Sequence, residues 1–260
     1  MLLRRIIEHV RAQNWTAIVL DFVIVVVGVF IGIEVSNWNE SLAFERRERA
    51  LLVELRGEVA QNMADAQAKG EGFLVGAGSA RRILDAIHDE SQRCTDDCWD
   101  MTVDLMHASQ WQQIMSSWTT YDELRRDGLP SDRRLIEMIE KYKVYSHQVD
   151  QALSIRPRYR TLVRGLIPIQ FQDDYWDHCY SLDNAIEVYL YPCPSTGGVT
   201  IDAATIDAIL ANPDVASSLR EWTSIARVVG ETLTGPQQAL GHDILQRIDG
   251  TGSGKTGTVY

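Results

Sequence analysis

Four cysteines are the side chains of this 260-residue chain with the most predictable chemistry. They are Cys94, Cys98, Cys179 and Cys193, an even number. In an oxidising compartment such cysteines pair, and Cys94–Cys98 with Cys179–Cys193 is the most local of the three possible connectivities. A four-thiolate zinc site is the alternative, but the intervals C-x3-C and C-x13-C lack the C-x2-C pairs typical of structural zinc. The spacing therefore favours disulfides.

A second candidate for metal chemistry is the acidic, aromatic run QDDYWDHCY, residues 172–180. A calcium or zinc ion would require Asp173, Asp174, Asp177 and His178 to converge, and on a helix the three aspartates fall on one side. Neither EF-hand spacing nor an H-E-x-x-H motif is present in the sequence. We favour a solvated face whose aspartates neighbour the arginines of residues 156–164, and we expect no metal and no cofactor.

Catalytic motifs are weak. Gly254-Lys255-Thr256 resembles the end of a phosphate-binding loop, but Asp249 stands where that motif requires glycine. The chain has no G-x-S-x-G motif, and its six histidines are scattered singly. A Ser–His–Asp arrangement assembled only in three dimensions stays open, but we expect the protein not to be an enzyme.

The charge of the chain limits the classes of partner that it is expected to bind. The formal net charge of -11 disfavours binding to phosphate backbones, so we expect no nucleic-acid partner. Within this acidic chain, RPRYRTLVR is a local basic patch that would suit anionic lipid or an acidic partner. We favour pairing with the protein's own carboxylates for its four arginines, Arg156, Arg158, Arg160 and Arg164.

The element that must position all these residues runs from Trp15 to Trp38 and is almost wholly apolar, interrupted only by Asp21 and Glu34. As a helix it places the two indoles roughly 34 Å apart, slightly more than the hydrocarbon thickness of a bilayer. Tryptophan at both edges is typical of interfacial belts, so Trp15 and Trp38 are predicted interfacial anchors of one transmembrane helix in the lipid bilayer.

Charges around this helix predict its orientation. Arg4, Arg5 and Arg11 precede it with one acid, Glu8, so the positive-inside rule places the N-terminus in the cytoplasm and the remainder across the membrane. A cleaved signal peptide is the competing interpretation, since residues 41–43 are a possible cleavage site. That site lies well beyond the apolar run, so we favour an uncleaved anchor. Residues 2–13 are expected to form an amphipathic helix on the inner membrane face, or else a solvated tail.

The predicted transmembrane helix carries two features suited to association. Gly28 and Gly32 form G-x-x-x-G, which allows a second helix backbone to approach closely. Asp21 lies inside the cytoplasmic edge, where a carboxylate requires water, a partner or a proton. A position at headgroup depth is the favoured interpretation of Asp21, and a partner contact or proton-linked site is the alternative.

The helix is expected to continue past Trp38, because apolar residues recur at three- and four-residue steps among Glu, Arg and Gln through Ala66. Four glycines between Gly70 and Gly78 predict either a break or close packing of another helix. Residues 99–115 predict a further helix. Thr120 with Glu123 predicts a capping box at the start of a later helix. Further helix starts are predicted by N-caps at Ser131, at Asp202 and at Asn212, which Pro213 follows.

At the anchor's end, Asn37-Trp38-Asn39-Glu40 is followed later by Thr-Tyr-Asp-Glu-Leu at 120–124 and by Gly128. Over roughly residues 1–150, this combination resembles a bacterial family of single-pass membrane proteins catalogued as a domain of unknown function. The resemblance implies an amphipathic N-terminus, one anchor and a mainly helical extracytoplasmic region. It implies no activity and no catalytic residue, and the cysteines are not part of the pattern.

The predicted fold class is all-α, with a single N-terminal transmembrane helix continuing into a long helix within a disulfide-stapled extracytoplasmic helical bundle. The expected segments are a cytoplasmic amphipathic segment (1–14), the transmembrane helix (15–38), a helical domain (39–248) and a flexible tail (249–260). We expect an accessory or scaffold subunit in the bacterial inner membrane, with a periplasmic main domain and a membrane-protein partner or homo-oligomer. A ligand-sensing bundle that signals through another membrane protein is the alternative.

Overall fold

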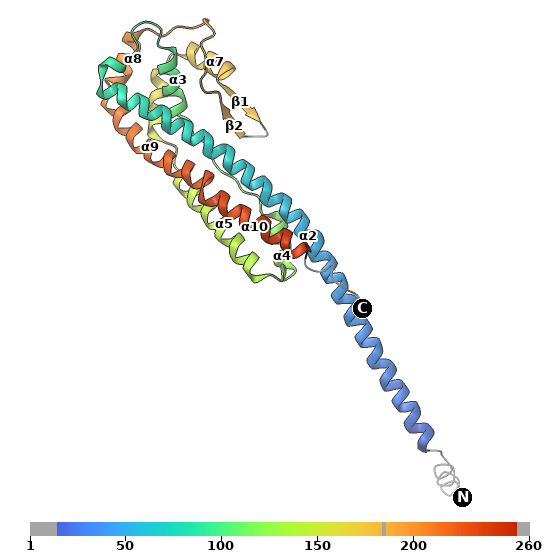
Figure 1. Ribbon diagram of the computed structural model, residues 1–260. Coiled ribbons are helices and arrows are strands. Elements are labelled where there is room, and N and C mark those ends of the chain that lie inside the picture. Colours follow the sequence, from blue (N-terminus) through green and yellow to red (C-terminus); the bar gives the residue numbers. More distant parts are fainter. Residues whose placement is uncertain (1–14, 184–185, 254–260) are drawn as a thin grey trace, which may run out of the picture. The chain divides into compact units, whose positions relative to one another are not determined.

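The computed structural model describes residues 15–183 and 186–253, apart from the side chains of residues 15–18, 21 and 251–253 (Figure 1). The chain divides into two units, residues 1–51 and residues 52–260. Helix α2 (Trp15–His88) contributes to both. No proline occurs over its length, so every backbone amide is free to donate within the helix. The amphipathic segment predicted at residues 2–13 lies outside the described residues.

The second unit is a helical bundle, and its helices follow the apolar stripes of the sequence. The part of α2 after residue 52 lies beside α9 (Pro213–Thr234), and α5 (Arg133–Ala152) and α10 (Pro236–Ser253) complete this part (Figure 1). Apolar residues at three- and four-residue steps, from Val215 to Leu233 in α9 and from Leu135 to Val149 in α5, predict a helix face toward the core, and in both helices this stripe is buried. The all-α prediction is confirmed. Helix α10 ends at Ser253, beyond the predicted start of the tail at residue 249.

Glycine allows α2 and α9 to cross closely. A Cβ added at Gly70 would lie 2.9 Å from the Leu233 Cβ, and one added at Gly230 would lie 3.0 Å from the Gly70 carbonyl oxygen. The first distance is shorter than real Cβ contacts, and the second is tighter than nine in ten of them. The glycines from 70 to 78 therefore do not break α2, which continues to His88; of the two alternatives, close packing is confirmed.

Two of the predicted N-caps are confirmed. The Asp202 carboxylate accepts a hydrogen bond from the Thr205 amide at the start of α8 (Ala203–Leu210), and Asn212 accepts one from the Asp214 amide at the start of α9. Ser131 is not the cap of α5: Asp132 accepts from the amides of residues 134 and 135. Both amides donate to one oxygen of this carboxylate, Oδ1, and the other oxygen accepts a hydrogen bond from Arg247 on α10.

The capping box predicted at Thr120 and Glu123 is wrong. Helix α4 (Thr119–Arg126) begins one residue earlier, so Thr120 lies inside the helix, and the side chain of the N-cap residue, Trp118, makes no capping hydrogen bond. Its free amides donate instead to the Glu58 carboxylate on α2, from Thr120 at 3.1 Å and Tyr121 at 3.2 Å. A side chain 62 residues earlier in the chain therefore caps this helix. Gly128, with φ of 77°, ends the turn that follows.

Helix α3 (Trp99–Ala108) is shorter than the helix predicted over residues 99–115. The following segment is irregular, and part of its hydrogen bonding is with side chains of α2. Asn62 donates to the Ser117 carbonyl (2.7 Å) and accepts from the Ser117 amide (3.0 Å), while the Lys69 ammonium donates to the Gln113 carbonyl (3.0 Å). These contacts satisfy backbone groups that a continued helix would have paired internally.

The remaining elements lie at one end of the bundle: η1 (Glu90–Gln92), α6 (Arg158–Leu166), α7 (Ile169–His178) and a two-stranded hairpin. Strands β1 (Tyr180–Asp183) and β2 (Ile186–Tyr189) pair antiparallel, with Tyr180 opposite Tyr189 (Figure 1). The sequence analysis missed this hairpin. Four residues per strand give too short an alternation to distinguish a strand from a loop.

Candidate functional site

The first candidate site is the apolar part of α2. From Val19 to Val35 its large apolar side chains are between 46% and 69% exposed. Among the residues that the structure describes, α2 is the one helix both long and apolar enough to cross a bilayer. A soluble protein does not leave such a surface in water, so the helix is compatible with a membrane anchor.

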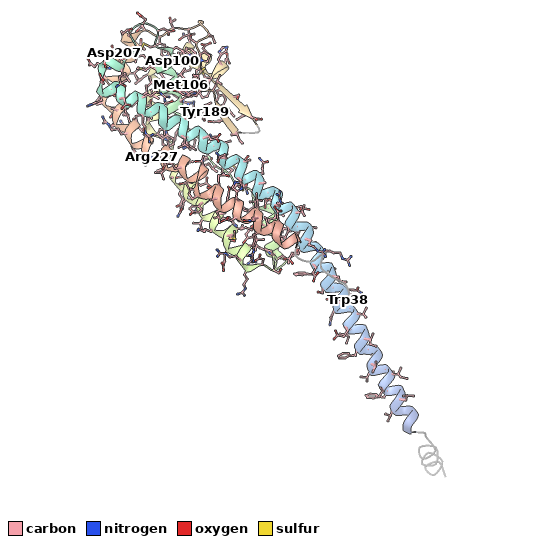
Figure 2. The ribbon with its side chains drawn as sticks, viewed as in Figure 1. Trp38, Asp100, Met106, Tyr189, Asp207 and Arg227 are labelled. Carbon is pink, nitrogen blue, oxygen red and sulfur yellow. A yellow bond between two sulfur atoms is a disulfide. The ribbon has the colours of Figure 1, made fainter. Side chains whose placement is uncertain are left out.

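The predicted association face on this helix is open. A Cβ added at Gly28 or at Gly32 would meet no atom within 4 Å. Trp38, one of the two predicted interfacial anchors, is 65% exposed and points away from the helix axis (Figure 2). The side chains of Trp15 and Asp21 lie outside the described residues, so their predicted roles stay predictions.

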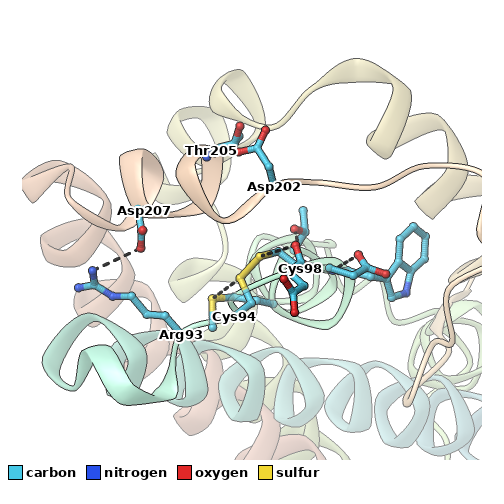
Figure 3. The surroundings of a disulfide bond; sticks show 11 residues. Arg93, Cys94, Cys98, Asp202, Thr205 and Asp207 are labelled. Atoms are coloured by element: carbon cyan, nitrogen blue, oxygen red, sulfur yellow. Dashed lines mark hydrogen bonds and ion pairs between the residues drawn. A yellow bond between two sulfur atoms is a disulfide. The ribbon is translucent and has the colours of Figure 1, made fainter.

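Both disulfides have the predicted local connectivity. Cys94–Cys98 closes the loop before α3, and Cys179–Cys193 brackets the hairpin. Around the first bridge, the Cys98 amide donates to the Ile201 carbonyl (3.2 Å), and Arg93 pairs with Asp207 on α8 (Figure 3). Each bridge joins a loop to the end of a helix, so the zinc alternative is not needed to explain the cysteines.

The acidic run on α7 makes contacts that differ from those expected. Asp174 faces the His178 imidazole, with Oδ1 and Nδ1 3.2 Å apart, and it accepts hydrogen bonds from the Thr196 hydroxyl. The expected neighbours were arginines, and none of the described ion pairs of Asp173, Asp174 or Asp177 is with an arginine. In the described part of the chain, no three Asp, Glu, His or Cys side chains converge in a way that suits a metal ion.

The basic patch also departs from expectation, because within residues 15–183 and 186–253 only Arg158 of the patch pairs with a carboxylate, that of Asp214 (3.0 Å). Arg160 donates to the Ser109 carbonyl (3.0 Å), and Arg164 donates to the Ser109 hydroxyl (2.9 Å) and to the Gln110 side chain (2.9 Å). The other contacts are with aromatic rings, Arg156 over Trp111 and Arg164 over Trp176. The patch is therefore built against the segment that follows α3.

A recess of about 260 Å³ lies where the C-terminus of α5 and the start of α6 meet α9. Ile155, Trp222 and Ile225 form its apolar wall, and Arg156 and Glu221 lie at its polar side. Its volume is slightly below the range usual for small-molecule sites, and its mixture of apolar and charged groups is typical of them. The sequence does not predict this recess, because its residues come from two stretches that are far apart in the chain, 151–158 and 218–225.

His107 is a buried titratable group that none of the predicted motifs includes. It is 1% exposed, and neither ring nitrogen has a hydrogen-bond partner among the described residues. The rings of Tyr175, Tyr189 and Tyr191 lie 5.5 to 6.0 Å from the imidazole. Burial lowers the pKa of His107 to about 4, so the imidazole is neutral at physiological pH.

No family model, curated protein or solved structure matches the chain. The resemblance to a single-pass family at residues 37–40 and 120–124 therefore stays a prediction.

Proposed function

We propose that the protein is a non-enzymatic interaction protein, anchored in the bacterial inner membrane by α2 and presenting its helical domain to the periplasm. The observation that supports this most is the exposed apolar surface from Val19 to Val35, with an open glycine face at Gly28 and Gly32. A lipid bilayer would cover the apolar surface, and a second transmembrane helix would fit against the glycine face. The two disulfides agree with an oxidising compartment.

The proposed periplasmic location can be tested by measuring the membrane topology of the chain and the oxidation state of its cysteines. In intact spheroplasts, externally added protease should digest the domain after residue 52 and leave the apolar part of α2 in the membrane. A thiol-reactive polyethylene glycol should add no mass to the denatured protein until a reductant opens the two bridges. Protection from external protease together with four reactive thiols would contradict the proposal.

Association is tested by gentle solubilisation of the native membrane and capture through a tag at the C-terminus. We expect either a second copy of the chain or one membrane protein at near-equal amounts, identified by mass spectrometry. The variant with Gly28→Ile and Gly32→Ile should lose that species, while the matched control Gly57→Ile should keep it, because Gly57 lies on α2 outside the apolar stretch. A monomer without partner in the parent protein would count against an accessory role.

The recess between α5, α6 and α9 favours a second function, a ligand-sensing bundle that signals through a partner membrane protein. Stabilisation of the purified protein by a small molecule, abolished by Trp222→Ala and retained in an Ile169→Ala control, would support it. Trp222 lines the recess, whereas Ile169 is exposed on α7. If no compound of a broad metabolite set stabilised the protein, the ligand-sensing function would lose its support.

A further inference from the structure

Three arginines on or beside α6 converge on one short segment of chain. Arg156, Arg160 and Arg164 follow one another at four-residue steps, and they contact residues 109–111. The guanidinium groups of Arg160 and Arg164 both reach Ser109, one at its carbonyl and the other at its hydroxyl. The two positively charged guanidinium groups therefore lie close together, because both are hydrogen-bonded to Ser109.

None of these three arginines has a carboxylate within ion-pair distance in residues 15–183 and 186–253. Elsewhere in the described chain, seven arginines do, namely Arg56, Arg82, Arg93, Arg134, Arg158, Arg227 and Arg247. The contrast is sharpest with Arg158, which lies between Arg156 and Arg160 in sequence and pairs with Asp214. Other described arginines without an ion pair, such as Arg81, Arg133 and Arg220, are exposed to solvent, whereas Arg160 and Arg164 are partly buried.

Arg160 and Arg164 are half-buried, which makes the missing counter-charge costly. Burial, and then the charge of Arg160, lower the pKa of Arg164 to about 10; burial also lowers the pKa of Arg160. The acid whose charge opposes these shifts is Glu187 on β2, which is outside ion-pair distance and accepts a hydrogen bond from the Tyr189 hydroxyl.

Capping of α3 explains only part of this arrangement. Helix α3 ends at Ala108, and cations at its C-terminus interact favourably with carbonyls that carry about half a negative charge. That half charge offsets little of two or three full positive charges. Each guanidinium also has five N–H donors, of which Arg160 uses one nitrogen and Arg164 two in the contacts described. Arg160 and Arg164 therefore keep N–H donors that these contacts do not use, and most of their positive charge is not offset by the helix end.

We propose that Arg160 and Arg164, with Arg156 at the edge, form a binding site for a small oxyanion, a carboxylate or a phosphate group. The planar fork of a guanidinium suits both groups, because each offers two oxygens at the spacing of two N–H donors. Glu187 on the neighbouring hairpin partly screens the site and competes with the ligand. The site does not depend on membrane anchoring or on a protein partner.

Titration of the purified full-length protein in detergent tests the site, with inorganic phosphate and succinate as probes and sodium chloride keeping the ionic strength constant. Arg164 lies 4.9 Å from the Trp176 ring centre, so bound anion should change tryptophan fluorescence saturably. We expect at least one probe to do so, and to raise the melting temperature. Trp176→Phe should lose most of the fluorescence response and keep the melting shift. Response to phosphate alone or to succinate alone would identify the group preferred.

Variants decide whether the arginines are responsible. Arg164→Gln and Arg160→Gln should each weaken binding about tenfold or more, since a charge-assisted hydrogen bond is lost. The matched control Arg158→Gln should leave binding unchanged. Glu187→Gln should tighten binding several-fold while keeping an acceptor for Tyr189, and it serves as the test where an arginine variant fails to fold.

Two results would overturn the inference. One is the absence of a saturable response to either probe, beyond that to chloride, in both the parent and the Glu187→Gln protein. The other is a response that Arg160→Gln and Arg164→Gln leave unchanged. Neither result bears on the membrane-associated function, which is read by capture from the membrane.

Discussion

In helix α2, Gly28 and Gly32 have the same spacing as Gly72 and Gly76, but their surroundings differ. A Cβ on either of the first pair meets nothing within 4 Å. On the second pair it would lie 3.0 Å from the Tyr189 ring and 3.0 Å from the His107 carbonyl oxygen. The same four-residue spacing thus occurs once against other parts of this chain and once with no covering residue in the part of the chain that the structure describes. We conclude that the spacing by itself indicates room for a neighbour and does not say which molecule provides it.

The largest expected effect concerns His107, whose carbonyl covers Gly76. Its folded pKa of about 4 lies below the value of about 6.5 in an unfolded chain, so between these pH values the unfolded state binds more protons. The free energy of unfolding is therefore complete above pH 6.5 and falls as the pH drops toward 4, by on the order of 3 kcal/mol. Urea unfolding at a series of pH values measures this slope.

Carboxylates also contribute to acid unfolding, so the slope must be compared between variants. His107→Met, which keeps an apolar side chain in the buried site, should flatten the slope between pH 4 and 6.5. His242→Gln, at an exposed position on α10, should leave it unchanged. Equal slopes for the parent protein and His107→Met would show that His107 does not titrate as its burial implies.

The next effect is steric and concerns Gly70, at the crossing of α2 and α9. Gly70→Ala would place a methyl group 2.7 Å from the Thr234 methyl carbon and 2.9 Å from the Leu233 Cβ. Overpacking of this kind should lower the free energy of unfolding by about 1–3 kcal/mol. Gly57→Ala, where a Cβ meets nothing within 4 Å, should instead stabilise the helix by up to about 1 kcal/mol. Denaturant titration of both variants tests this difference in sign.

A smaller effect is expected at Glu58, the side chain of α2 that caps α4. Glu58→Ala removes the acceptor for the amides of Thr120 and Tyr121 and should cost about 0.5–2 kcal/mol of unfolding free energy. Glu54→Ala, an exposed residue one turn earlier on α2, is the matched control and should change stability little. Equal losses in the two variants would mean that Glu58 does not act as a cap.

The smallest effect on folding is expected at the uncovered glycines. The paired changes Gly28→Ala and Gly32→Ala should leave the unfolding of residues 52–260 within about 0.5 kcal/mol of the parent value. The same changes should weaken association in a membrane mimetic, measured by sedimentation equilibrium or cross-linking. A stability loss like that of Gly70→Ala would show that this face has a partner within the chain after all.

Local signals predicted most of the fold. The stripe from Val215 to Leu233 predicted α9 because a helix facing a core repeats every three to four residues, and Asp202 and Asn212 predicted starts because an N-cap is a local contact. The connectivity of the disulfides was also the most local one. What could not be predicted joins distant residues: Glu58 with α4, Arg160 and Arg164 with Ser109, and the rings around His107.

The site residues divide in the same way. Gly28, Gly32 and Trp38 were identified from spacing and residue type along one helix, and the structure shows them exposed. The three unpaired arginines were noticed as a basic patch, but their pairing was predicted wrongly because composition says how many carboxylates exist and not where they lie. His107 and the recess beside Trp222 had no local signal, since burial depends on neighbours from several elements.

The bridge between Cys179 and Cys193 has a consequence for proteolysis of the domain. It encloses the whole hairpin, from Tyr180 to Tyr189, within a covalent ring. A single cut by a protease anywhere in that ring would open the loop but release no fragment, because both pieces stay joined through sulfur. On a gel, the nicked protein would migrate as one chain without reductant and as two chains with it. A protease could thus cut the chain within this ring while Glu187 and the arginines of α6 stay in one molecule.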